Sequence, residues 1–105
     1  MTAQKCCLTI VFPRALEEDV VDLLLAHPQW VTGFTLTHTE GAGSSVRLRG
    51  TAEHVRGRAR RMQVQVVLDE SYARGLLDAI RGEFHRREIA YWLTPVIEFA
   101  RLWES

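Results

Sequence analysis

The stretch RMQVQVVLD, residues 61–69, decides how this chain is expected to fold. Its apolar residues at positions 62, 64, 66 and 68 alternate with mostly polar ones, and a period of two is typical of a strand with one buried face. Asp69 favours the N-cap of a helix. Gly75 and Gly82 are expected to weaken that helix by up to about 1 kcal/mol each. The helix, residues 70–87, has an apolar stripe made by Ala73, Leu76, Leu77, Ile80 and Phe84.

The same strand-then-helix order occurs in the first half of the chain. Residues 5–12, KCCLTIVF, predict a strand that is apolar on both faces, and Pro13 ends it. Residues 33–39, GFTLTHT, predict the second strand, with its threonines on one face. Between these strands, residues 15–26 predict a helix with an acidic first turn and an apolar stripe made by Leu16, Val20, Leu23, Leu24 and His27.

The last strand is predicted at residues 89–93, and Pro95 is expected to interrupt it. The order β-α-β-β-α-β over one domain, residues 1–105, predicts an α+β ferredoxin-like sandwich. In this fold two helices cover one face of a four-stranded antiparallel sheet. Because the first strand is apolar on both faces, we expect further copies of the chain to cover the other face. Trp103 is expected to pack against the sheet or against a neighbouring subunit.

Composition limits the function classes. The formal net charge is zero, which argues against bulk nucleic-acid binding. No apolar run reaches the ~18–20 residues of a membrane span, and residues 1–12 do not resemble a secretory signal. Cys6 and Cys7 are adjacent, so on a strand they point to opposite faces and a disulfide between them would be strained. We therefore expect a cytoplasmic protein that is not embedded in the membrane.

A long segment, EGAGSSVRLRGTAEHVRGRARR at residues 40–61, separates the second and third strands. It holds six of the chain's 13 basic residues and four glycines. We interpret residues 41–60 as a permissive arm that binds an acidic protein partner, and we expect residues from about 43 to 58 to be mobile without it. A solvated flexible insertion is the alternative interpretation. The arginines expected to contact the partner are Arg47, Arg49, Arg56 and Arg58.

Several segments together resemble the PII family of signalling proteins. These are GFTLTHTEGAG (33–43), LRGTAEHV (48–55), RMQVQVVLDES (61–71) and YWLTPVIEFARL (91–102). The resemblance implies a homotrimer with ligand clefts between subunits, and makes the arm similar to the family's partner-binding T-loop. It is nearest to a proteobacterial PII-like group of unknown function, sometimes encoded beside heavy-metal efflux systems, which implies a membrane transporter or efflux component as partner. The ligand-binding residues that it implies are Thr35, Gly41, Gly43 and Arg101.

The chain departs from the PII pattern where that family holds nucleotide phosphates. Ala90 stands at the position of a lysine, Trp103 and Ser44 stand at positions of arginines, and FHRREI (84–89) replaces a glycine-rich loop. Backbone N–H groups and basic side chains are what hold phosphates in such sites. We therefore expect binding of ATP or ADP in the family manner to be weak or absent.

Two functions from different classes remain open at this point. The first is a trimeric regulatory protein whose arm binds a partner under the control of a small ligand. The second is a metal-binding accessory protein in heavy-metal tolerance, similar to the CutA proteins, with a divalent metal on His38, Glu40 and His54. A titration with nucleotides and small anions, or with copper, zinc and cobalt, separates them. Since the sequence contains no catalytic motif, we do not expect an enzyme.

Overall fold

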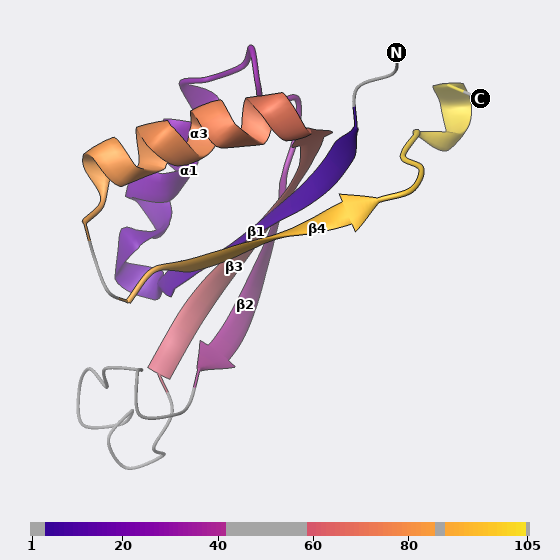
Figure 1. Ribbon diagram of the computed structural model, residues 1–105. Coiled ribbons are helices and arrows are strands. Elements are labelled where there is room, and N and C mark those ends of the chain that lie inside the picture. Colours follow the sequence, from indigo (N-terminus) through magenta and orange to yellow (C-terminus); the bar gives the residue numbers. More distant parts are fainter. Residues whose placement is uncertain (1–3, 42–58, 86–87, 105) are drawn as a thin grey trace.

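The computed structural model describes residues 4–41, 59–85 and 88–104, and these form a four-stranded antiparallel sheet with two α-helices on one face (Figure 1). The strand order is β2-β3-β1-β4, so β2 and β4 are the edges. The predicted ferredoxin-like fold is confirmed. The elements in chain order are β1 (Lys5–Pro13), the 3-10 helix η1 (Arg14–Leu16), α1 (Glu17–Leu25), β2 (Thr35–Gly41), β3 (Ala59–Asp69), α3 (Glu70–Glu83), β4 (Ala90–Val96) and the 3-10 helix η2 (Leu102–Glu104).

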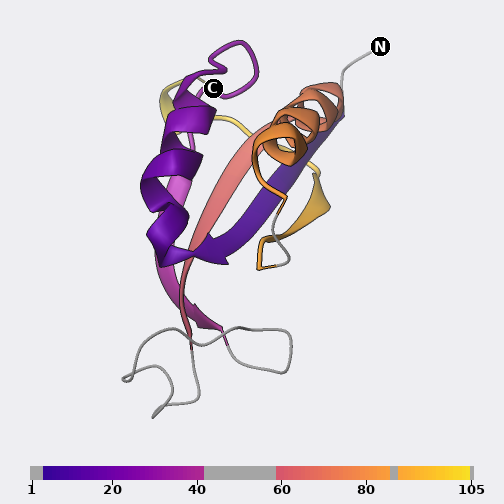
Figure 2. The same cartoon turned by 90° about the vertical axis from the view of Figure 1, so that its left-hand side faces the viewer.

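The core lies between the helices and one face of the sheet. Figure 2 shows α1 above the β2 side of the sheet and α3 above the β1 and β4 side. Alternate residues of the two central strands point into this layer, as their period of two predicts. The buried strand residues are Cys6, Leu8, Ile10, Phe12, Met62, Val64, Val66 and Leu68. The helices contribute Val20, Leu23, Leu24, Ala73, Leu76, Leu77 and Ile80.

The start of α3 differs from the prediction in its mechanism. Asp69 does occupy the N-cap position, but its carboxylate pairs with Lys5 Nζ at 2.8 Å, and within the described residues it makes no side-chain capping hydrogen bond. The first helical N–H, that of Glu70, instead donates to the carbonyl of Gln4 at 2.8 Å. The helix also ends at Glu83, before the predicted end at residue 87, because Phe84 turns to an extended conformation.

Gly75 has a packing role that sequence reasoning missed. A Cβ atom at this position of α3 would lie 2.8 Å from the ring of Trp30, which is closer than real Cβ contacts. Trp30 in turn stacks on His27, with ring centroids 5.0 Å apart. Since α1 ends at Leu25, His27 lies in the connection between α1 and β2. The prediction that His27 extends the apolar stripe of this helix is therefore wrong.

The strand ends also differ from the prediction. β4 runs through Pro95, which pairs with Cys6 of β1. An edge strand accommodates proline because one side of it has no ladder to donate to. β2 continues to Gly41 and β3 begins at Ala59, so the ends of the predicted arm, residues 41–60, belong to the sheet.

Two arginines assigned to the long segment are strand residues. The register places Arg60 opposite Glu40, and opposite charges across a strand pair favour pairing. Arg61 is only 4% exposed, and its Nη1 donates to the carbonyl of Glu88 at 3.0 Å. The other four arginines of the segment lie outside the described residues.

The C-terminal segment, residues 97–104, leaves most of its apolar side chains in solvent. Trp103 is 81% exposed, so the expectation that it packs against the sheet of its own chain is wrong. Packing against a neighbouring subunit stays a prediction. Other exposed apolar side chains on β4 and this segment are Tyr91, Trp92, Ile97, Phe99 and Leu102. Among the described residues, no helix is long and apolar enough to span a membrane.

Candidate functional site

A groove of about 260 Å³ lies on the face of the sheet opposite the helices. The segment after β4 passes behind the sheet in Figure 2, and two of its residues form one wall of the groove. The other wall comes from β2, from the residues just before it, and from β3. The lining residues are Thr32, Gly33, Phe34, Thr35, Gln65, Val67, Phe99 and Arg101.

Strand register explains why polar groups meet in this groove. Thr35 begins β2 directly opposite Gln65 of β3. Both alternate with core residues, so both lie on the face away from the helices. Arg101 approaches from the C-terminal segment, where its Nη2 lies 3.5 Å from the position that a Cβ on Gly33 would take. A hydroxyl, an amide and a guanidinium thus share a groove that can donate hydrogen bonds to an anion.

The four residues that the PII resemblance implies for ligand binding do not all lie in this groove. Thr35 and Arg101 line it together, although they are far apart in the sequence. Gly41 lies at the opposite end of β2, next to the start of β3. Gly43 lies outside the described residues.

Sequence reasoning missed Gly33, Gln65 and Phe99 as lining residues. A signal for Gln65 was present, since the alternation of β3 places it on the face that the β2 threonines also occupy. The strand register that sets Gln65 opposite Thr35 could not be predicted, because it depends on how β2 pairs with β3. Phe99 follows a strand whose length was underestimated, so its return over the sheet was not foreseen.

The predicted metal ligands are only partly brought together. His38 and Glu40 do share one face of β2, but they line a second pocket, of about 270 Å³, together with three arginines. His54 lies outside the described residues. Within the part of the chain that the structure describes, no three His, Cys, Asp or Glu side chains form a group that could hold a metal ion. The metal-binding alternative therefore has no supporting observation in that part.

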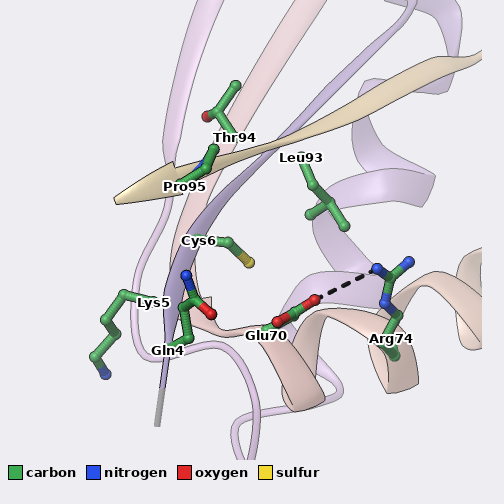
Figure 3. Close-up of a pocket in the computed structure, with 8 residues that line it drawn as sticks. All are labelled: Gln4, Lys5, Cys6, Glu70, Arg74, Leu93, Thr94 and Pro95. Carbon is green, nitrogen blue, oxygen red and sulfur yellow. Dashed lines mark ion pairs between the residues drawn. The ribbon is translucent and has the colours of Figure 1, made fainter. Parts of the chain in front are cut away.

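A third pocket, of about 290 Å³, lies between the start of α3 and the edge strand β4 (Figure 3). Figure 3 shows the sulfur of Cys6 pointing between Leu93 and Glu70. Burial, and then the negative charge of Glu70, raise the pKa of the Cys6 thiol. The thiol therefore stays protonated and is a poor nucleophile at neutral pH. Arg74 Nη2 pairs with Glu70 Oε2 at 3.5 Å, so the charges of this wall satisfy each other.

The predicted partner-binding arginines cannot be placed on this framework. Arg47, Arg49, Arg56 and Arg58 all lie outside the described residues. The ends of the segment that carries them are nevertheless fixed by the pairing of Gly41 with Ala59. The segment therefore leaves the sheet at the end far from the groove, because Thr35 and Gly41 are at opposite ends of β2.

Comparison with known protein families gives a match over nearly the whole chain. A family model described as "Protein of unknown function (DUF3240)" matches residues 2–103. The comparison with curated proteins gave no significant match.

Solved structures share the fold. A DUF3240 family protein from Shewanella baltica OS155 superposes with a TM-score of 0.74 at 17% identity, covering 96% of this chain and 99% of that one. CPII, a nitrogen regulatory PII-like protein from Thiomonas intermedia K12 bound to ADP, AMP and bicarbonate, gives 0.67 at 19% identity, covering 88% and 89%. A PII-like signalling protein from Thermus thermophilus gives 0.63 at 19% identity, covering 91% and 90%. At these identities the likeness shows a common fold.

Proposed function

This chain belongs to the DUF3240 family of proteins of unknown function, and we propose that it acts as a PII-like regulatory protein. In this proposal a small anionic ligand in the groove controls the binding of a protein partner by the arm, residues 41–60. The observation that carries the proposal is the meeting of Thr35 and Arg101 in one groove, because the PII resemblance implies both as ligand-binding residues.

The size and charge of the groove favour a small anion. Sites for drug-sized ligands usually have volumes of about 300–1,000 Å³, and the groove of a single chain, about 260 Å³, lies below that range. Arg101 is the one basic residue among its described lining. The groove therefore fits bicarbonate, or one part of a nucleotide whose remainder contacts a second copy of the chain. Ala90, at the position of the PII lysine, favours weak nucleotide binding.

Assembly into a homotrimer would add a further wall to the groove and would cover the exposed apolar side chains beside it. The groove is bounded by Phe99, which is 47% exposed, and the neighbouring residues Leu102 and Trp103 are more exposed still. Contiguous exposed apolar side chains of this kind mark association surfaces. Further copies of the chain are the proposed partners for this surface, as the first strand's two apolar faces already predicted.

The ligand is tested by isothermal titration calorimetry with bicarbonate, AMP and ADP, the compounds bound to the Thiomonas protein. Arg101→Ala should weaken binding about tenfold or more, because a charge-assisted hydrogen bond is lost. Arg74→Ala is the matched control, since it removes an exposed arginine outside the groove. Equal loss in both variants, or no binding of any of the three compounds to the parent protein, would contradict the proposal.

The partner is tested separately. We propose an acidic protein surface, such as that of a membrane transporter or efflux component, as the target of Arg47, Arg49, Arg56 and Arg58. Replacing all four by alanine should abolish affinity capture of the partner while circular dichroism and oligomeric mass stay unchanged. Capture by the parent protein should weaken with salt. Unfolding of the quadruple variant would show that these residues belong to the scaffold.

A further inference from the structure

The pocket between the start of α3 and the edge strand β4 exists because one helix cannot cover three strands. Adjacent strands lie about 4.8 Å apart and a helix is about 10 Å across. α3 packs mainly on β1 and β3, so the helix-side face of β4 is only partly covered (Figure 3). We call this space the α3–β4 pocket. Its volume is about 290 Å³, and its described lining includes Gln4, Cys6, Glu70, Arg74, Leu93 and Pro95.

The floor of the α3–β4 pocket is formed by strand residues that share one face. Cys6 of β1 pairs with Pro95 of β4, and Leu93 lies two residues before Pro95 on the same strand. Strand alternation therefore directs all three side chains toward the helix side. Lys5 and Thr94 also border the pocket, but the same alternation directs their side chains to the opposite face. The side chains of the floor are thus a thiol and two apolar groups.

The thiol of Cys6 is buried and free. The residue is only 5% exposed, and Figure 3 shows its sulfur pointing into the pocket, between Leu93 and Glu70. Within the described part of the chain this thiol makes neither a disulfide nor a hydrogen bond. Burial raises the pKa of the Cys6 thiol, so the floor carries no charge at neutral pH. A ligand on this floor would meet an uncharged surface with one polar group that lacks a partner.

The rim of the α3–β4 pocket carries one charge of each sign. Arg74 Nη2 lies 3.5 Å from Glu70 Oε2, and the two side chains are 63% and 50% exposed. Such an exposed ion pair is weak, so a ligand can share both groups. The third charged residue at the rim, Lys5, pairs with Asp69 at 2.8 Å. The rim therefore favours a ligand that itself carries one positive and one negative charge.

The start of α3 is held in position before any ligand binds. The backbone N–H of Glu70 donates to the carbonyl of Gln4 at 2.8 Å, which ties the first helical residue to the segment before β1. Groups that are positioned in advance lose less conformational entropy when a ligand binds.

We propose that the α3–β4 pocket binds a free α-amino acid with an apolar side chain. The ammonium group would pair with Glu70 and the carboxylate with Arg74, because both are charge-assisted hydrogen bonds. The side chain would lie on Leu93 and Pro95. The volume of about 290 Å³ lies just below the usual range for drug-sized ligands, about 300–1,000 Å³, and suits a small metabolite. The pocket is on the helix side of the sheet, whereas the groove of the proposed regulatory ligand is on the other face, so this inference does not depend on that groove.

The probe is L-leucine, titrated into the full-length protein by calorimetry at neutral pH. Three further compounds each lack one of the groups that the pocket is proposed to bind. Glycine lacks the apolar side chain, isocaproate lacks the ammonium group, and isoamylamine lacks the carboxylate. The parent protein should bind L-leucine about tenfold or more tightly than each of these compounds. Equal binding of isocaproate or isoamylamine would overturn the proposal, because the ligand would then not be recognised as a zwitterion.

Two conservative variants test the rim. Glu70→Gln and Arg74→Gln should each weaken the binding of L-leucine about tenfold or more, since each removes one charge-assisted hydrogen bond. Asp78→Asn is the matched control, because it removes an exposed pair with Arg81, also at 3.5 Å on α3, outside the pocket. It should bind L-leucine as the parent does, and an equal loss in this variant would overturn the proposal. Circular dichroism confirms the fold of each variant, and if Glu70→Gln unfolds, Arg74→Gln carries the test.

Labelling of Cys6 places the ligand in the pocket. In the variant Cys7→Ser, Cys6 is the one remaining thiol of the chain, and its alkylation by iodoacetamide at mildly alkaline pH is followed by mass spectrometry. L-leucine should slow this reaction in proportion to the fraction of protein that is bound, and glycine at the same concentration should not. No binding of L-leucine at millimolar concentration, no labelling of Cys6 without it, or labelling that L-leucine does not change would each overturn the proposal.

Discussion

The two faces of the sheet differ in how completely one chain covers them. On the face toward the helices, β1 and β3 bury every second side chain, and Phe12 and Leu8 are fully buried. On the other face and along the C-terminal segment, large apolar side chains such as Trp92 and Trp103 stay exposed. The difference shows that the first face is covered within the chain, whereas the second face and the C-terminal segment leave large apolar side chains exposed.

The middle of the open face, which is the face of the sheet away from the helices, is an exception to this difference in exposure. Thr9, on the central strand, is only 1% exposed although it points away from the helices. The register sets Gln65 and Trp92 beside it on the two neighbouring strands. The larger side chains of Gln65 and Trp92 thus cover the small side chain of Thr9. The exposed apolar side chains of this face lie instead on β4 and on the segment that follows it.

The largest effect on folding is expected on the helix-covered face. Phe12→Ala should lower the free energy of unfolding by about 3–5 kcal/mol, because it leaves a cavity in a closely packed core. Phe12→Leu is the control and should cost less than about 1.5 kcal/mol. Urea denaturation at one protein concentration measures both. Similar small losses in the two variants would show that this face is less tightly packed than described.

The next effect concerns the contact that closes the helix layer. Gly75→Ala should overpack the site at a cost of about 1–3 kcal/mol, because the new Cβ would meet the Trp30 ring at 2.8 Å. The gain in helix propensity, about 1 kcal/mol, offsets part of that loss, so the net destabilisation should be up to about 2 kcal/mol. Gly82→Ala in the same helix has open space around its Cβ and should be neutral or stabilising. A gain in melting temperature from Gly75→Ala would contradict the contact.

A smaller effect is expected at the junction of β1 and α3. Lys5→Ala removes the 2.8 Å ion pair between Lys5 and Asp69, and both of these side chains are partly exposed. Solvent screening limits such a pair to less than about 1 kcal/mol. Thermal unfolding at low and high salt measures it, and the difference between variant and parent should shrink as salt rises. A difference that is unaffected by salt would mean that Lys5 acts through packing.

The smallest effect on the folding of a single chain, and the sharpest test of the comparison, is expected at Trp103. Trp103→Ala removes a side chain that is 81% exposed, so the fold should persist with a change within about 0.5 kcal/mol. Light scattering should nevertheless show a lower mass than the parent, which we expect near three times the chain mass of 12.0 kDa. Leu25→Ala, an exposed leucine on α1, should leave the parent mass unchanged.

A parent protein with the mass of one chain at micromolar concentration would remove the basis of that prediction. It would mean that the exposed side chains of the open face and of the C-terminal segment have another occupant. A mass loss in Leu25→Ala as large as in Trp103→Ala would place the association surface on the helices.

The sequence by itself determined the elements, their order and the buried face of each central strand. Periods of two and of helical spacing are local properties, because alternate strand residues and successive helical turns repeat along the chain. For this reason the ferredoxin-like arrangement and the core positions, Val64 and Leu77 among them, could be predicted without coordinates.

Only the tertiary structure decided which distant residues meet. The pairing of β2 with β3 placed His38 and Glu40, two of the three residues that suggested a metal, in a pocket that three arginines also line. The return of the C-terminal segment over the open face brought Arg101 to Thr35. The strand register and the path of the C-terminal segment depend on contacts between segments far apart in the chain. The local sequence pattern of one segment does not show which distant residues it will contact.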